Sequence, residues 1–145
     1  MPSSPGIELG KLGEQYAAAY LEQLGYHLVA ANFTLPVGRN LRGATINAEI
    51  DLVAYDGDTL CFIEVKTRAS DWFAPPEASI DLRKRRQIAR AARAYRELFD
   101  LESTPFRFDV VSVVLSDSES PRVDLLKNYF TSDRLRSVAI AAERS

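Results

Sequence analysis

The sequence predicts an α/β fold in which helices flank a mixed β-sheet. Two observations support this prediction. Long stretches repeat apolar residues every three to four positions, and shorter stretches are continuously apolar or alternate apolar with polar residues. These patterns follow one another in the order α-β-β-β-α-β-β. A long helix that interrupts a run of strands is typical of a sheet with helices on its faces.

One helix and three strands are predicted in the N-terminal part of the chain. Residues 6–24 are expected to be helical, and Gly25 stands where a C-terminal glycine cap belongs. Residues 35–45 are predicted to be a loop because they are rich in Pro, Gly and Asn. The Asp-Gly-Asp sequence at 56–58 indicates a hairpin turn. The expected strands cover residues 26–33, 46–55 and 59–67.

A parallel crossover is predicted in the C-terminal part. Residues 80–99 are expected to form a second helix, with Ser79 as its N-cap. The strand expected at 106–115 is apolar on both faces, which indicates an interior position in the sheet. Together with the strand before it, this helix fits a right-handed parallel unit. The last predicted strand covers residues 122–130.

The length of 145 residues predicts a single domain, with its core at about 7–130 and a C-terminal helix or tail at 131–145. No apolar run is long enough to span a membrane, and the N-terminus lacks the pattern of a secretory signal. The single Cys61 excludes an internal disulfide and a cysteine-based zinc site. We therefore expect a cytoplasmic protein with no membrane partner and no small-molecule cofactor.

The net charge of −2 hides a strongly basic segment. Residues 81–96 carry seven cations against one acid, a local excess that attracts polyanions. The alternative interpretation is an ordinary solvated helix face. The cations of this segment are Arg83, Lys84, Arg85, Arg86, Arg90, Arg93 and Arg96.

Three residues of the predicted hairpin stand out as candidates for chemistry. Side chains alternate along a strand, so Asp51 shares a face with Glu49, and Glu64 shares a face of the next strand with Lys66. A two-residue turn within residues 56–58 places Asp51 directly opposite Glu64. Their Cβ atoms are then expected to lie roughly 5 Å apart.

Two carboxylates this close repel each other unless a positive charge lies between them. Carboxylates and water are the hard oxygen ligands that suit Mg²⁺ or Mn²⁺. Such a metal ion can activate water and stabilise the charge that develops when a phosphodiester is cleaved, and Lys66 can assist. A Glu-x-Lys triplet is also common by chance on the exposed side of a strand. The strongly apolar strands around these acids favour the functional interpretation, because buried acids are costly.

Four motifs resemble the YraN-like family of uncharacterised bacterial proteins. That family is similar to the PD-(D/E)xK nuclease superfamily, which includes restriction endonucleases and Holliday-junction resolvases. The resemblance therefore implies a restriction-endonuclease-like three-layer core with a mixed central sheet. The motifs are Gly10-x-x-Gly13-Glu14, Glu49-Ile50-Asp51-Leu52-Val53, Phe62-Ile63-Glu64-Val65-Lys66-Thr67-Arg68 and Arg107-Phe108-Asp109-Val110-Val111.

The resemblance also implies roles for individual residues. Asp51 and Glu64 match the two metal-binding acids, and Lys66 matches the catalytic lysine. Glu14 matches an acid that resolvase-like enzymes bring to the metal from a helix outside the sheet. Thr67 and Arg68 follow the lysine and are expected near the substrate. The residues expected to bind nucleic acid are Arg68, Arg83, Lys84, Arg85, Arg86, Gln87 and Arg90.

Three functions remain open at this point. The first is a Mg²⁺- or Mn²⁺-dependent endonuclease that acts on DNA, including branched or single-stranded DNA in repair or recombination. A homodimer is expected if the substrate is a symmetric junction. The second is a nucleic-acid-binding module without catalysis. The third is a protein-interaction domain that uses the basic helix at 80–99.

Overall fold

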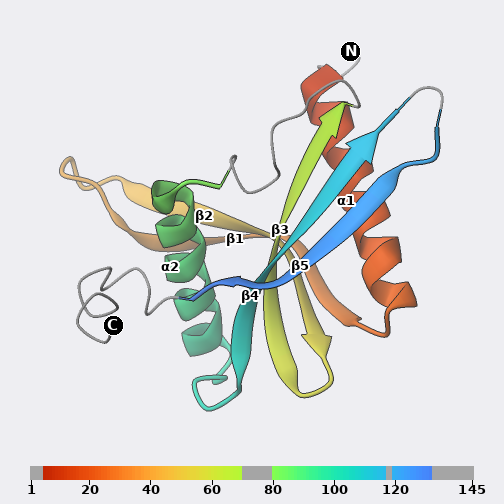
Figure 1. Cartoon of the computed structure of the whole chain (residues 1–145). Helices are drawn as coiled ribbons and strands as arrows, with labels where there is room; N and C mark the ends of the chain where they lie inside the picture. Colours follow the sequence, from red (N-terminus) through yellow and green to blue (C-terminus); the bar gives the residue numbers. More distant parts are fainter. Residues whose placement is uncertain (1–4, 70–79, 117–118, 132–145) are drawn as a thin grey trace, which may run out of the picture.

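The computed structural model describes residues 5–69, 80–116 and 119–131, with side chains from Leu9 onward. The predicted order of elements is confirmed, and the five strands form one mixed sheet in the order β1-β2-β3-β4-β5 (Figure 1). The expected C-terminal helix or tail lies outside the described residues, apart from Thr131. The elements are α1 (Pro5–Gln23), β1 (His27–Arg39), β2 (Thr45–Asp56), β3 (Thr59–Ala69), α2 (Leu82–Leu98), β4 (Phe106–Leu115) and β5 (Arg122–Phe130).

The parallel crossover is confirmed. β3 pairs with β4 in parallel, while all the other neighbouring strands are antiparallel. α2 connects the two parallel strands. It begins at Asp81, whose side chain accepts a hydrogen bond of 2.9 Å from the Lys84 amide, so Asp81 and not Ser79 is the N-cap. α1 ends at Gln23, and Gly25 follows as the expected C-terminal glycine cap. Its φ of +94° is a left-handed conformation that glycine adopts with little strain.

The two helices cover opposite faces of the sheet, which gives three layers (Figure 1). Alternation along β3 explains this arrangement. Leu60 and Phe62 join the core beneath α2, whereas Cys61 and Ile63 join the core beneath α1. In the described part of the chain, no helix is both long and apolar enough to cross a membrane.

The prediction of a loop at residues 35–45 is wrong for residues 35–39, which belong to β1. β1 continues to Arg39 and pairs with β2 as far as Thr45, so that the connection is only residues 40–44. Pro36 is tolerated because β1 is an edge strand, where a missing backbone N–H leaves no neighbour unpaired. A register shift between Pro36 and Gly38 relieves the remaining irregularity.

The sheet divides between β2 and β3. These strands pair only from Leu52 opposite Ile63 to Asp56 opposite Thr59, whereas β1 stays paired with β2, and β3 with β4, far beyond that point. Figure 1 shows β1 and β2 leaving the sheet on one side of α2 while β3 continues on the other. We call this separation, just beyond Leu52 and Ile63, the strand fork.

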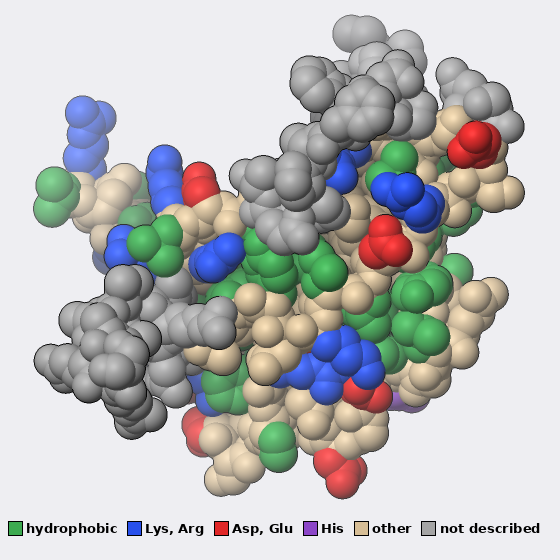
Figure 2. Space-filling view, in the orientation of Figure 1, with side chains coloured by type: hydrophobic (Ala, Val, Ile, Leu, Met, Phe, Trp, Pro, Cys, Tyr) green, Lys and Arg blue, Asp and Glu red, His purple; other side chains and the backbone are tan. Residues whose placement is uncertain are grey.

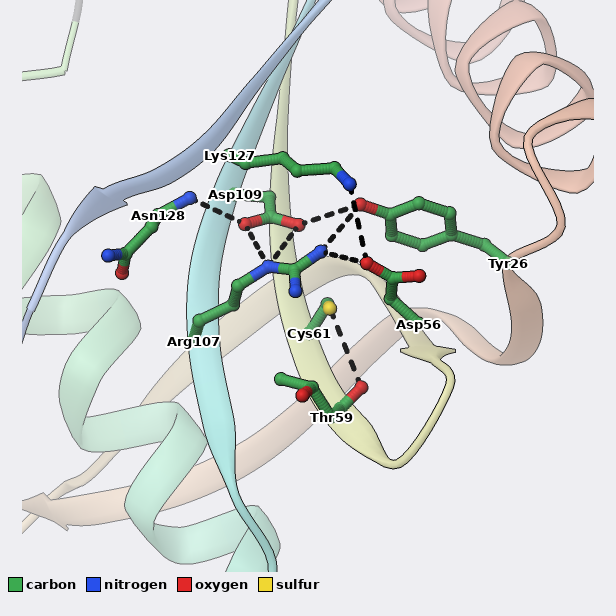
Figure 3. A network of polar contacts seen from close by, with 8 residues as sticks. All are labelled: Tyr26, Asp56, Thr59, Cys61, Arg107, Asp109, Lys127 and Asn128. Atoms are coloured by element: carbon green, nitrogen blue, oxygen red, sulfur yellow. Dashed lines mark hydrogen bonds and ion pairs between the residues drawn. The ribbon is translucent and has the colours of Figure 1, made fainter.

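A buried polar network fixes the other end of the sheet (Figure 3). The Asp109 side chain has no solvent exposure and accepts a hydrogen bond of 2.9 Å from Arg107 Nε. It also accepts one of 2.8 Å from the amide of Asn128, at a register shift between β4 and β5. Arg107 Nη2 lies 2.7 Å from Tyr26 Oη and from Asp56 Oδ2. The network therefore ties the start of β1 and the β2–β3 turn to β4 and β5.

Candidate metal centre at the strand fork

Asp51 and Glu64 are the first residues beyond the paired part of β2 and β3. The register of that ladder is the predicted one, because Asp56 lies opposite Thr59 and Leu52 opposite Ile63. At the fork the Asp51 side chain replaces a backbone carbonyl of β2 as the hydrogen-bond acceptor for β3. Its Oδ2 accepts a hydrogen bond of 2.9 Å from the Val65 amide. This bond satisfies an N–H that the departing strand leaves without a backbone partner, and it fixes the position of Asp51.

Glu14 reaches the same place from α1. One carboxylate oxygen from each of Glu14, Glu49 and Asp51 lies within 4.8 Å of the other two, and this is the cluster with metal-binding potential found among the described residues. Gly13 permits the close approach of α1, because a Cβ at that position would overlap the Thr67 side chain of β3. The structure thus brings the carboxylates of Glu14 and Asp51 together.

Glu49 is a member of this cluster that the sequence-based prediction missed. Its alternation with Asp51 along β2 was the available signal, since two positions along a strand share a face. Neither this alternation nor the family resemblance gave Glu49 a role in metal binding. At the fork β2 has already left β3, so that Glu49 and Asp51 can both turn toward α1.

The pKa values of the Asp51 and Glu49 carboxyl groups lie above their ordinary values. Burial and the nearby Glu64 carboxylate raise the pKa of Asp51 to about 7, although the hydrogen bond from Val65 opposes this shift. Burial and the Asp51 side chain also raise the pKa of Glu49 above its ordinary value. Acids that hold their protons this strongly lack a compensating positive charge. A divalent cation coordinated by their oxygens would supply that charge.

Glu64 is buried and lies beside two lysines. Its Oε1 is 3.7 Å from Lys66 Nζ on the same strand and 3.6 Å from Lys84 Nζ on α2. Glu64 therefore interacts with Asp51 of the acidic cluster on one side and with two lysines on the other. The structure brings together the predicted Asp51, Glu64 and Lys66, and it places Lys84 at the site itself.

Arg68 follows two positions after Lys66 on β3. Its Nε and Nη1 atoms are buried, and among the described residues neither has a hydrogen-bond acceptor. Buried donors of a charged group are costly to leave unpaired, and an anion is the partner that a guanidinium pairs with best. The Arg68 guanidinium therefore needs an acceptor that the described residues do not supply.

The other residues predicted to bind nucleic acid fall into two groups. Arg83, Arg86 and Gln87 are exposed on α2. Arg85 instead contacts Tyr129 and lies over its ring, and Arg90 donates a hydrogen bond of 2.7 Å to the Val37 carbonyl of β1. The last two therefore hold α2 against the edges of the sheet.

The donor set suits a hard divalent cation. Carboxylate oxygens from two elements converge, and the Cys61 thiol lies outside the site, with a pKa that burial raises to about 12. Fold and site together define an α/β protein with a carboxylate–lysine centre at a fork in a mixed sheet.

The chain belongs to the uncharacterised protein family UPF0102, whose sequence profile matches residues 13–113. This is the YraN-like family that the four motifs predicted. A UPF0102 protein of Solibacter usitatus (strain Ellin6076) is 42% identical over 121 residues, covering 83% of this chain and 84% of the relative. One from Syntrophus aciditrophicus (strain SB) is 40% identical over 124 residues, covering 86% and 89%.

A solved structure described as "Crystal structure of SSO0001" aligns with 98% of this chain at 16% identity and a TM-score of 0.41. The alignment spans 62% of that chain.

Proposed function

We propose that this protein is a metal-dependent nuclease that hydrolyses DNA phosphodiester bonds at the strand fork. One observation carries the proposal: Glu14, Glu49 and Asp51 converge from α1 and β2 beside the Glu64, Lys66 and Lys84 group. Acids that can hold a metal next to lysines that can stabilise an anion are the components that phosphodiester hydrolysis requires. The resemblance of the motifs to the PD-(D/E)xK superfamily supports the same reaction.

Asp51, Glu14 and Glu64 are the predicted ligands of Mg²⁺ or Mn²⁺, and Glu49 joins them in this proposal. When bound, the metal supplies Lewis acidity toward the phosphoryl oxygen and lowers the pKa of a coordinated water. The hydrogen bond from Val65 to Asp51 orients one ligand before the metal arrives. Gly13 allows α1 to bring Glu14 close enough to be another.

The cationic side chains bind and orient the substrate. Lys66, held beside Glu64, orients the attacking water and stabilises the negative charge of the transition state. Lys84 approaches the same carboxylate from α2 and offsets part of the negative charge that Glu64 places beside Asp51. The Arg68 guanidinium donates hydrogen bonds to a phosphate oxygen of the DNA backbone, the acceptor that its Nε and Nη1 lack among the described residues. A nuclease of this kind would act on DNA in the cytoplasm, as the composition predicts.

The test is a cleavage assay with purified protein on labelled duplex, single-stranded, flap and four-way-junction DNA. Parallel reactions contain Mg²⁺, Mn²⁺ or EDTA, and the variants are Asp51→Asn/Glu64→Gln and, as a matched control, Glu22→Gln on the exposed side of α1. We expect metal-dependent cleavage by the wild type and the control, and a loss of at least about 100-fold in the double variant.

Cleavage that persists in the double variant would contradict the proposed site. DNA binding without cleavage by the wild type under any metal would instead favour the binding-module alternative. The exposed Arg83 and Arg86 on α2 suit that alternative equally well.

A further inference from the structure

The long β1–β2 hairpin projects beyond the strand fork. Its distal part, which we call the β-arm, consists of Phe33–Arg39, the turn at 40–44 and Thr45–Ile50. Phe33 packs edge-to-face on Tyr95 of α2 with ring centroids 5.2 Å apart, and Arg90 of α2 binds the Val37 carbonyl. The base of the β-arm is therefore fixed to α2, and its tip extends past the helix (Figure 1).

The tip of the β-arm is a rigid turn. Asn40 Oδ1 accepts hydrogen bonds from the amides of Arg42 at 2.9 Å and Ala44 at 3.0 Å. The backbones of Asn40 and Ala44 also pair at 2.9 Å, and Arg39 Nη1 donates to the Gly43 carbonyl at 2.8 Å. These hydrogen bonds all lie within residues 39–44 and order the turn locally.

This turn presents an apolar side chain between two arginines. Leu41 is fully exposed, with a relative exposure of 108%, and it is flanked by Arg39 and by the exposed Arg42. Scattered exposed leucines are ordinary on protein surfaces. Here, however, a turn built from side-chain and backbone hydrogen bonds directs the leucine outward between two cations.

Cations predominate around the tip, although Glu49 lies at the base of the β-arm and Asp81 at the start of α2. Residues 23–48 contain no Asp or Glu, in a chain that has 20 acidic residues. The same is true of residues 82–96, where Arg83, Arg86 and Arg90 are spaced to lie along one side of α2. Lys84 contacts Glu64 at the fork and Arg90 contacts Val37 of β1, so α2 connects the fork with the β-arm. Figure 2 shows several Lys and Arg side chains over the β-arm and the adjoining part of α2, with an acidic side chain beside them.

We infer that the β-arm is a second contact to duplex nucleic acid, in which Arg39 and Arg42 bind backbone phosphates and Leu41 enters a groove as an apolar wedge. A two-stranded β-ribbon fits the major groove of B-DNA, and apolar side chains flanked by cations insert between base steps in the minor groove. This inference rests on the proposed function and specifies its substrate as a duplex that extends away from the fork.

The β-arm also sets the distance to the fork. Thr45 and Asp51 are six positions apart along β2, which corresponds to about 20 Å of extended chain. That distance equals about six base-pair steps of a duplex. A substrate with fewer paired bases on that side would not reach the tip.

The test is binding of labelled 24-base-pair and 6-base-pair duplex DNA, followed by fluorescence anisotropy at several salt concentrations with Ca²⁺ in place of Mg²⁺. The variants are Arg42→Ala and Leu41→Ser. Arg122→Ala on β5 and Leu24→Ser after α1 are matched controls, because both of these side chains are exposed far from the β-arm in the chain. Melting temperatures of the variants should stay near the wild-type value, since the tip side chains support nothing else.

We expect Arg42→Ala to weaken binding of the long duplex and to lower the slope of log affinity against log salt by about one. Leu41→Ser should weaken binding several-fold without changing that slope, and both controls should behave as wild type. Binding of the long duplex that the tip variants leave unchanged would overturn this inference but not the proposed function. A tip effect on self-association alone, seen by analytical ultracentrifugation, would also overturn it. Absence of any salt-dependent DNA binding by the wild type would overturn both.

Discussion

Replacement of Asp51 by Asn should make the metal-free protein more stable at pH 8. Burial and Glu64 raise the pKa of Asp51 to about 7, so the folded protein loses stability when this carboxyl group ionises. Asn keeps an oxygen that accepts the hydrogen bond from Val65, but it carries no charge. Allowing for the partial exposure of the site, we expect a gain of about 2 kcal/mol, or about 6 to 8 °C in Tm.

The sign of the pH dependence follows from the same shift. An unfolded chain releases the Asp51 proton near pH 3.8, whereas the folded protein keeps it until about pH 7. As the pH rises from about 4 to 7, the metal-free wild type therefore loses stability relative to the Asn variant. The difference in unfolding free energy between the two proteins should be smaller at pH 5 than at pH 8. Thermal unfolding at a series of pH values measures this difference.

Mg²⁺ should reverse the ranking. A metal that binds only the folded wild type raises its stability by about 2.7 kcal/mol at 100 times the dissociation constant. Asp51→Asn should show little of this rise, while Glu22→Gln should show all of it. An Asn variant that is no more stable than the wild type without metal, or that keeps the full response to Mg²⁺, would show that Asp51 is not a strained metal ligand.

Replacement of Asp109 by Ala should give the largest loss of stability of any single substitution considered. The variant leaves Arg107 Nε, the Tyr26 hydroxyl and the Asn128 amide without their acceptor (Figure 3). Breaking a buried ion pair from one side costs about 3 to 5 kcal/mol, and Arg107 keeps only its partly exposed ion pair with Asp56 as compensation. Urea unfolding followed by circular dichroism measures the change.

Two further variants separate this effect from a general sensitivity of the sheet. Asp124→Ala removes an exposed carboxylate of β5 that lies 3.5 Å from Arg122, and it should cost less than about 1 kcal/mol. Arg107→Ala/Asp109→Ala should lose less than the sum of the two single losses. Strictly additive losses, or a cost for Asp109→Ala as small as that for Asp124→Ala, would contradict the role given to the network.

Much of the fold could be predicted because it depends on local patterns. The interior strand β4 and the register of the β2–β3 hairpin follow from apolar runs and from the turn at 56–58. The length of β1 could not be predicted in this way. In a sequence alone, Pro36 and Gly38 indicate a loop. They are compatible with a strand here because β1 lies at the edge of the sheet, and that position is known only from the structure.

The site was predictable as a set of residues but not as an arrangement. Alternation placed Asp51, Glu64 and Lys66 on shared faces, and the resemblance to a family added Glu14. The fork depends on where two strands separate, which is a tertiary feature without a local signal. For that reason Glu49 was missed, and so was the pairing of Lys84 with Glu64. Asp109 was recognised only within a motif, because its partners come from positions distant in the chain.

The most direct test of the central claim is anomalous diffraction from crystals of the protein grown with saturating Mn²⁺. We expect an anomalous peak among the carboxylates of Glu14, Glu49 and Asp51, beside Glu64, and no such peak in crystals of Asp51→Asn. Wild-type crystals that show the carboxylates of the fork well ordered but without a peak, or with the peak at another place, would contradict a metal-dependent site at the strand fork.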